Sequence, residues 1–498
     1  MKILFVAAEV GPYVSVGGLS QVLYFLPKAL AARGHEVAIF TPEFGTMREK
    51  GKWNLKEEVM GLKVSAGGGK ELICNVNSHK NQKSNVTTYF LENREYYELR
   101  ANVFGYKDDH VRFALMCRGA LEWLLIQKQK GASLPDVIHC NDWHASYFIE
   151  LAKTEKRYKE ILSNIPILLT VHNFGYQGNY DYAYCSENDR DDLKKPLKEM
   201  LDPELQKQNA LSRGILFADY VNTVSPTHAR EMITKEYAEN LYPLMRKVRS
   251  KLSGILNGLD DHEFDPSKDK RVKFKFTYDN FREARKANKL YLQKMFGIPQ
   301  DASKFLLAYS GRLAGQKGVE LITGAMKHYL KERKNAQLIV LGGGDDYFRK
   351  ELTALQIKHP EQVGLHLMSN FELPRQIFAG ADILLIPSIF EPGGIVALEA
   401  LRYGAIPVVR RTGGLNDIVT EFEPGKKTGN GFSFTEKSSW SLYGAVARAE
   451  SYFYHSKLWG KLVKNALAAD FSWKNAAAQY EEWYEQAKRK AGKFGNIE

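Results

Sequence analysis

The 498-residue sequence has few cysteines and no long apolar run. The four cysteines form no close pair, so their spacing suggests neither a zinc site nor a disulfide framework; they are Cys74, Cys117, Cys140 and Cys185. No stretch approaches the ~18–20 consecutive apolar residues of a membrane helix. The apolar run at residues 3–8 ends at Glu9 without a convincing cleavage site, which indicates a buried strand rather than a secretory signal. These absences favour a cytoplasmic location and no membrane span.

Positive charge is abundant but spread along the chain. The formal net charge is +12, from 70 basic and 58 acidic residues. Such a balance suits nucleic acid, an anionic membrane or phosphate-bearing substrates. Basic segments such as residues 153–159 and 268–275 are typical of solvated faces, and no zinc finger or other short nucleic-acid motif accompanies them. We therefore expect no nucleic-acid partner.

The first half of the chain predicts a doubly wound α/β sheet. A strand at residues 3–8 leads through Gly17 and Gly18 to a helix at 19–32, which Pro27 is expected to kink, and then to a strand at 36–40. Strand, glycine turn, helix and strand in this order are typical of doubly wound folds. Later apolar strands alternate with helical stretches; they are expected at residues 137–140, 165–171 and 220–224.

The second half repeats this order after a break near residues 254–258. A strand at 305–310, a glycine-rich turn at 311–318 and a helix at 319–332 are followed by further strands, which are expected at residues 337–341, 383–387 and 406–410. A chain of this length exceeds what one core usually supports. We therefore expect two Rossmann-like domains, residues 1–259 and 260–471, with ligands in a cleft at the carboxyl ends of both sheets.

Glycine-rich turns in both halves are candidate phosphate sites. Gly17 and Gly18 would let backbone N–H groups approach a diphosphate at a helix N-terminus, although a glycine pair is often purely structural. Arg312 and Lys317 flank the turn of the second half and suit a leaving diphosphate. The alternative is an exposed basic loop.

Two carboxylates follow the strand expected at 383–387. Glu391 lies at the strand end, and Glu399 follows eight residues later, two helical turns along. Between them Gly393 and Gly394 expose N–H groups at a new helix N-terminus, which favours an anion. The alternative is a helix cap with an exposed glutamate.

Polar residues also end two strands of the first half. His172 and Asn173, followed by Tyr176 and Gln177, make a sugar-binding surface plausible, although a single histidine is more often structural. The histidines and aspartate at residues 139–144 invite a metal site, but their spacing provides no recognisable ligand set, so we expect no metal.

Taken together, these motifs resemble those of the starch and glycogen synthases, nearly end to end. The resemblance includes Val-Ser-Pro-Thr at 224–227, residues 252–258 and 405–415, and Phe-Ser-Trp at 471–473. It implies a GT-B fold with two facing Rossmann-like domains, and a last helix, within 472–498, that crosses back to the first domain. It also implies transfer of glucose, with retention, from ADP-glucose or UDP-glucose to the non-reducing end of an α-1,4-glucan, without a metal or cofactor.

The same resemblance assigns roles to residues. It implies a catalytic group of His172, Glu391, Arg312 and Lys317, in which the two cations bind the diphosphate. The implied donor-binding residues are Gly17, Gly18, Asn173, Phe371 (on the base), Gly393, Gly394, Ile395, Val396 and Glu399. The implied acceptor-binding residues are Asp142, Tyr176 and Gln177.

Several positions depart from the family pattern around the donor. Ser15 replaces a phosphate-binding lysine; the other departures are Asn141 for His, Gly315 for an acidic residue, Ile389 for Arg, Gly393 for Cys and Ala397 for Gln. They leave open the donor nucleotide, the sugar and a reduced activity. The alternatives are a transferase with another donor or acceptor, a nucleotide-sugar epimerase, and a non-catalytic glucan-binding protein. The retained catalytic group argues against the last.

Overall fold

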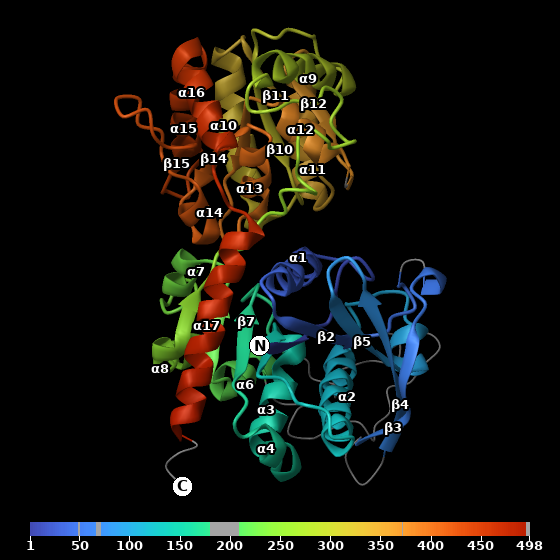
Figure 1. The fold of residues 1–498 in the computed structure, drawn as a ribbon. Helices are drawn as coiled ribbons and strands as arrows, with labels where there is room; N and C mark the ends of the chain where they lie inside the picture. The colour runs from blue at the N-terminus through green and yellow to red at the C-terminus, as the bar shows by residue number, and fades with distance from the viewer. Residues whose placement is uncertain (48–49, 66–70, 180–208, 371, 495–498) are drawn as a thin grey trace. The chain divides into compact units, whose positions relative to one another are not determined.

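The computed structural model describes residues 1–47, 50–65, 71–179, 209–370 and 372–494 (Figure 1). The chain divides into two compact units. Unit 1 contains Met1–Val224, Ala229–Ile255 and Trp473–Glu498, and unit 2 contains Ser225–His228 and Leu256–Ser472. The division therefore falls after Ile255, slightly earlier than residue 259, where the sequence suggested it.

Unit 1 is built on a mostly parallel sheet with the order β3-β4-β5-β2-β1-β6-β7-β8-β9. Its central strands are apolar runs that are buried on both faces, as expected where helices cover a parallel sheet. Among the strands that the structure describes, the antiparallel pairs of this sheet are β3 with β4 and β4 with β5. The strands are β1 Lys2–Val6, β2 Glu36–Pro42, β3 Lys56–Ser65, β4 Glu71–Asn81, β5 Val86–Glu92, β6 Val137–Asn141, β7 Ile167–Val171, β8 Tyr220–Thr223 and β9 Leu252–Gly254.

The helices of unit 1 include one from the far end of the chain. α17, red in Figure 1, packs against α1 and brings Tyr484 to His139 at 2.8 Å between the hydroxyl and Nδ1. The first helix continues from Gly18 to Ala32 with Pro27 inside it, so the proline does not end the helix. The helices are α1 Gly18–Ala32, α2 Asp109–Gln129, α3 Ser146–Thr154, α4 Lys156–Leu162, α6 Ala210–Phe217, α8 Tyr242–Lys247 and α17 Trp473–Phe494, and α7 Pro226–Glu231 spans the division between the units.

Unit 2 has an entirely parallel sheet with the order β12-β11-β10-β13-β14-β15. Counted from β10, this is the strand order 3-2-1-4-5-6 of a Rossmann domain. The strands are β10 Phe305–Ser310, β11 Ala336–Leu341, β12 Val363–His366, β13 Ile383–Ile386, β14 Ile406–Arg410 and β15 Phe432–Phe434.

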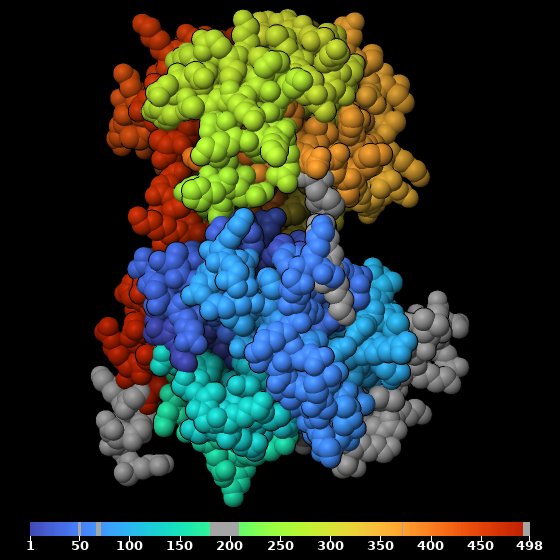
Figure 2. Space-filling view, turned by 45° about the vertical axis from the view of Figure 1, so that its right-hand side comes forward, coloured from blue at the N-terminus to red at the C-terminus, as the bar shows by residue number. Residues whose placement is uncertain are grey.

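Helices pack around this second sheet and enclose one continuous apolar core. In Figure 2 the yellow-green segment that begins unit 2 covers much of the face that is turned to the viewer. The helices are α9 Phe281–Met295, α10 Val319–Glu332, α11 Asp346–Lys358, α12 Leu373–Gly380, α13 Ile395–Arg402, α14 Gly413–Ile418, α15 Ser439–Phe453 and α16 Ser456–Leu467.

The predicted pair of doubly wound α/β sheets is confirmed, with one addition. No strands were expected at β3 and β4, whose alternating polar and apolar residues extend the sheet of unit 1. In each unit the strand order reverses beside its first strand, between β1 and β6 and between β10 and β13. Ligands of open α/β sheets bind outside the carboxyl ends of the strands at such switch points. None of the helices in the described ranges is long and apolar enough to span a bilayer.

Candidate active site

A cation and a carboxylate are in contact at the switch point of unit 2. Lys317 lies in the loop after β10, and Glu391 lies in the loop after β13. The Nζ of Lys317 is 2.6 Å from Oε2 of Glu391, to which the hydroxyl of Ser388 also donates at 3.0 Å. The two side chains are 27% and 12% exposed, so an incoming ligand can reach the pair. Two residues that the sequence predicted in separate motifs thus lie in direct contact.

Glycines and main-chain bonds hold these two loops together. Gly318, with φ +68°, lies so close to β13 that a Cβ there would be 2.1 Å from the carbonyl oxygen of Pro387, so the turn requires glycine. The amide of Ile389 donates to the carbonyl of Gln316 at 2.8 Å, and the side chain of Gln316 donates to the carbonyl of Phe390 at 3.2 Å. The loops therefore form one rigid support for Lys317 and Glu391.

Arg410 holds the loop after β13 in place, although we assigned this residue no role from the sequence. It is 3% exposed, and its guanidinium donates to the carbonyl of Ser388 at 2.9 Å and to that of Ile389. The amide of Gly414 donates to the carbonyl of Glu391 at 3.0 Å. A cation at the carboxyl end of the apolar strand β14 was the signal that could have indicated this role.

Arg312 presents its charge to solvent from a fixed backbone. The hydroxyl of Tyr309 donates to the Arg312 carbonyl at 2.7 Å, whereas the exposed guanidinium makes one long contact, 3.4 Å, to Gln316. Arg312 and Lys317 therefore place two cations on one loop, which suits a diphosphate.

Several of the donor residues predicted for unit 2 lie at the start of the helix after Glu391. Gly394 has φ +66° and caps α13, which starts with Ile395 and Val396. Burial raises the pKa of Glu399 to about 7, and Arg375 opposes this rise. Phe371, which we expected on the nucleotide base, lies outside the described residues.

In unit 1 the loop after β1 is closed by a carboxylate that sequence reasoning missed. Glu9 is 2% exposed, and its Oε2 accepts the amides of Val16 at 2.7 Å and Gly17 at 3.2 Å. Burial raises the pKa of Glu9, and these hydrogen bonds oppose the rise. The Gly17 N–H that we expected to face a diphosphate thus donates to Glu9. A glutamate that ends an apolar strand just before a glycine turn was the available signal.

Ser15 contributes no charge to this loop. It is exposed, and its hydroxyl lies 2.8 Å from that of Ser20, which in turn donates to the carbonyl of Gly17 at 2.7 Å. The position at which the family pattern has a lysine is therefore occupied by a neutral side chain that is engaged within the loop.

Asp142 directly follows β6 and orients the loop after β7. It has φ +57°, an uncommon value outside glycine, and it is 9% exposed. Its Oδ1 accepts the amide of His172 at 2.7 Å. Burial raises the pKa of Asp142 to about 7; amide bonds from His172 and Asn173 lower it, and the charge of Glu9 raises it further. This carboxylate therefore positions the predicted sugar-binding loop.

The imidazole of His172 is held by Asn141 in a neutral form. Its Nε2 is 3.0 Å from Oδ1 of Asn141, whose amide nitrogen donates to the carbonyls of His139 at 3.2 Å and Val6 at 3.4 Å. Because that amide nitrogen faces the carbonyls, Oδ1 must accept from His172, which places the imidazole proton on Nε2. Only part of the ring reaches solvent, and burial lowers the pKa of His172 to about 3.

The predicted acceptor residues in the same loop differ in exposure. Tyr176 is 59% exposed. Gln177 is 8% exposed, and both ends of its amide are bonded, to the carbonyl of Phe174 at 3.3 Å and to the side chain of Asn209. Asn173 is partly buried, and its Oδ1 accepts the amide of Gly175 at 3.0 Å. Tyr176 is thus available to a ligand, whereas Gln177 supports the loop.

A group of carboxylates lies apart from these residues in unit 1. Carboxylate oxygens of Glu43, Glu92 and Glu98 lie within 4.8 Å of one another. Asn77 and Asn75 already donate to Glu43 and Glu92, at 2.7 and 2.9 Å. We assign no ion to this group, because acidic groups of this kind are common without one.

Comparison with known protein families agrees with this arrangement. Residues 2–247 match the starch synthase catalytic domain, and residues 293–456 match the glycosyl transferases group 1. The chain is 36% identical over 494 residues to a glycogen synthase of Geobacillus stearothermophilus, with 98% of each chain covered. It is 35% identical over 508 residues to a glycogen synthase of Geotalea daltonii, with 99% of this chain and 100% of the other covered.

Solved structures give the same result. The catalytic domain of starch synthase IV from Arabidopsis thaliana, bound to ADP and acarbose, superposes with a TM-score of 0.83 at 31% identity, over 98% of this chain and 99% of that one. A sucrose-phosphate synthase from Thermosynechococcus elongatus shares the fold, with a TM-score of 0.58 at 18% identity over 97% and 98% of the chains. The predicted GT-B fold is confirmed, and the chain belongs to the starch and glycogen synthase family of glycosyltransferases.

Proposed function

We propose that this glycosyltransferase elongates an α-1,4-glucan with glucose from ADP-glucose, retaining the anomeric configuration. The observation that carries the proposal is the contact between Lys317 and Glu391 at the switch point of unit 2, in a chain that is similar to glycogen synthases over 98% of its length. ADP is favoured as the nucleotide because the starch synthase that resembles the chain at 31% identity was solved with ADP.

In this proposal the two units contribute different residues to the reaction. In unit 2, Arg312 and Lys317 would neutralise the leaving diphosphate, because charge-assisted bonds to phosphate are roughly twice as strong as neutral ones. Glu391 would accept hydrogen bonds from hydroxyl groups of the transferred glucose while it keeps Lys317 in place. In unit 1, the neutral His172 and the exposed Tyr176 would contact the sugar and the glucan. The leaving phosphate would take the proton of the attacking hydroxyl.

We also propose that transfer requires no metal ion. Two cations on one loop can provide the charge stabilisation that a metal supplies in other phosphate-transferring sites. Glu391 already holds Lys317 at 2.6 Å, so little reorganisation of this cation is needed when a diphosphate arrives.

The test is incorporation of glucose into polymer. The full chain is incubated with glycogen, EDTA and radiolabelled ADP-glucose or UDP-glucose, and labelled polymer is digested with α-amylase. We expect label in the polymer from ADP-glucose and its release by α-amylase, which cleaves only α-linkages. Preference for UDP-glucose would change the assigned donor, and loss of activity in EDTA would contradict metal-free transfer. Sugar isomerisation without an acceptor would indicate the epimerase.

The cytoplasm is the proposed location. Cys74, Cys117 and Cys140 are buried free thiols, as is usual in a reducing compartment. Cell fractionation with an antibody to the protein would test this location; recovery in an exported fraction would contradict it.

A further inference from the structure

A basic cavity lies in unit 2 at the edge of the sheet opposite to the predicted active site. It has a volume of about 210 Å³ and is formed by α9, the end of α15, α16 and the segments that precede β10 and β13. The residues proposed for catalysis follow the carboxyl ends of these strands. Because a strand rises about 3.3 Å per residue, the six residues of β10 separate the two edges by roughly 20 Å. The cavity is therefore distinct from the site for transfer.

Four cations and one carboxylate line this cavity. Arg282 and Lys286, one turn apart on α9, are exposed, and within the described ranges neither has a hydrogen-bond or ion-pair partner. Lys289 lies one turn further and is 2.6 Å from Asp382, which is the carboxylate of the cavity. The wall thus carries a surplus of positive charge, of which two members are free to bind an anion.

A buried arginine adds to this surplus. Arg285 is 8% exposed, and its guanidinium donates to main-chain carbonyls, among them that of Phe378 at 2.9 Å. No carboxylate in the described part of the chain lies within ion-pair distance of it. Burial lowers the pKa of Arg285 to about 10, while Asp382 opposes the change. An anion in the cavity would compensate a charge that the protein leaves without an ion-pair partner.

Apolar and aromatic side chains also line the cavity. Phe453 and Trp459 lie edge to face, with ring centroids 5.5 Å apart, and Val463 continues this lining along α16. Nζ of Lys289 lies 4.7 Å from the ring centre of Phe453. A ligand with an anionic group and a flat or ring-shaped body would match both the cations and the aromatic residues of this lining.

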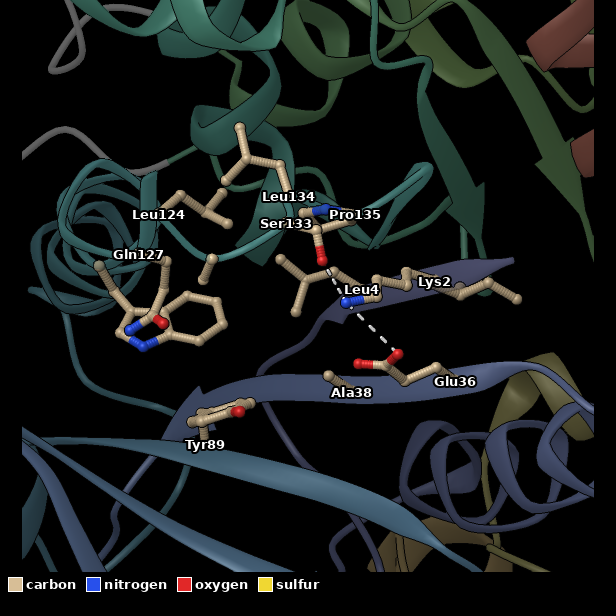
Figure 3. A pocket seen from close by; sticks show the side chains of 13 residues that line it. Lys2, Leu4, Glu36, Ala38, Tyr89, Leu124, Gln127, Ser133, Leu134 and Pro135 are labelled. Atoms are coloured by element: carbon tan, nitrogen blue, oxygen red, sulfur yellow. Dashed lines mark hydrogen bonds and ion pairs between the residues drawn. The ribbon is translucent and has the colours of Figure 1, made fainter. Parts of the chain in front are cut away.

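A cavity in unit 1 differs from the cavity in unit 2 in how its charges are paired. It has about 320 Å³ and also lies beside the amino ends of strands, at β1 and β2 (Figure 3). There the lysine is already used, since Lys2 lies 3.4 Å from Glu36 and also donates to Ser133 (Figure 3). The charges of that cavity are matched within the protein, whereas those of the cavity in unit 2 are not.

We propose that the cavity between α9 and α16 binds a small organic phosphate. Arg282 and Lys286 bind the phosphate group, and Phe453 and Trp459 contact its ring-shaped body. The volume is below the ~300 Å³ at which drug-sized pockets begin, so a phosphate monoester of a single ring is the appropriate size. Bound ligand stabilises unit 2 through mass action from a position remote from the transfer site.

The test uses phenyl phosphate as the probe, with the full-length protein and isothermal titration calorimetry at fixed ionic strength. The variant combines Arg282→Ala with Lys286→Ala. The control combines Lys331→Ala with Lys350→Ala, which removes the same charge from exposed positions on α10 and α11. Loss of two charge-assisted bonds should weaken binding by about 10-fold to 100-fold in the first variant and leave the control unchanged.

A second variant guards against a folding defect. The guanidinium of Arg282 packs directly on Gly460, so its loss could disturb α16, whereas Lys286→Ala removes only an exposed ammonium. The single variant should also bind phenyl phosphate more weakly than the wild type.

Equal binding of phenyl phosphate by all proteins, or no binding by the wild type, would overturn the proposed site. Inorganic phosphate that binds as tightly as phenyl phosphate would contradict the ring-binding wall. Binding of an oligoglutamate peptide but not of phenyl phosphate would assign the surface to an acidic protein instead.

Discussion

The two glycine-rich loops at the switch points of the units look alike in sequence but differ in charge. The loop of unit 2 carries Arg312 and Lys317, and the latter contacts Glu391 at 2.6 Å. The corresponding loop of unit 1 carries the neutral Ser15, and the buried carboxylate of Glu9 accepts two of its amides. One loop is prepared to receive an anion, whereas the other already contains one.

This difference shows that a glycine turn before a helix does not by itself make a phosphate site. The turn supplies amides, but a nearby carboxylate can satisfy them first. Of these two loops, the one in unit 2 carries the cations that we propose for a diphosphate, Arg312 and Lys317. Variants of each loop should therefore have different consequences.

Removal of the cation from the loop of unit 2 should have the largest effect. Lys317→Ala is expected to lower kcat by about 10²–10³-fold, the usual loss when a preorganised group that stabilises transition-state charge is deleted. It also leaves the carboxylate of Glu391 without its cation. Steady-state kinetics with ADP-glucose and glycogen would measure the loss, with Lys331→Ala as the control for an exposed lysine. Equal kcat in both variants would remove Lys317 from the mechanism.

The second largest effect concerns pH and belongs to unit 1. The pKa of Asp142 is raised by burial to about 7, so the folded state binds its proton more tightly than the unfolded state. The resulting stability is fully present below pH ~4 and is lost as pH rises through about 7, by on the order of 4 kcal/mol.

Asp142→Asn lacks this proton, so its stability should fall less steeply between pH 5 and 8 than that of the wild type. The slope is the readout rather than the stability itself, because the new amide N–H groups also need partners. Urea denaturation at several pH values would measure it. Parallel curves for the two proteins would contradict a raised pKa at this residue.

These contrasts also show what the sequence could and could not predict. The unit 2 loop was predictable because its strand, turn and helix have strong local signals: β10 and α10 occupy residues 305–310 and 319–332, as expected. Lys317 and Glu391 were predicted in separate motifs, but their contact depends on the parallel pairing of β10 with β13, which no local pattern contains.

The missed residues act through long-range contacts. Glu9 satisfies amides that lie seven and eight residues further on, and Arg410 donates to carbonyls 21 and 22 residues earlier. Neither has a fixed spacing that marks its role. The strands β3 and β4 were missed for another reason, because many of their residues are polar and exposed and the apolar signal is therefore weak.

Removal of the carboxylate from the loop of unit 1 should mainly affect stability. Glu9→Ala leaves the amides of Val16 and Gly17 without their acceptor and should lower the free energy of unfolding by about 1–2 kcal/mol. Glu9→Gln keeps an acceptor oxygen and should lose less. Thermal unfolding of the three proteins at one pH would compare them; an alanine variant as stable as the glutamine variant would mean that the carboxylate does not hold the loop.

The smallest change is expected where a cation is added to the loop of unit 1. Ser15→Lys places an ammonium at an exposed position at which the family pattern has lysine. We expect tighter binding of ADP by about 1 kcal/mol, typical of a single added hydrogen bond to a charged group at an exposed site. Its effect on kcat depends on whether the new contact is stronger in the transition state than in the ground state.

The control for this prediction must add the same charge elsewhere in unit 1. Ser250→Lys does so at an exposed residue just before β9, at the amino edge of the parallel sheet, whereas Ser15 lies at the carboxyl edge. Titration of ADP and UDP against the wild type and both variants at fixed ionic strength would separate a local contact from a general gain in charge. Equal tightening by both lysines would indicate long-range attraction only. No tightening by Ser15→Lys would mean that Glu9, at the base of the loop, neutralises the new cation before a diphosphate can use it.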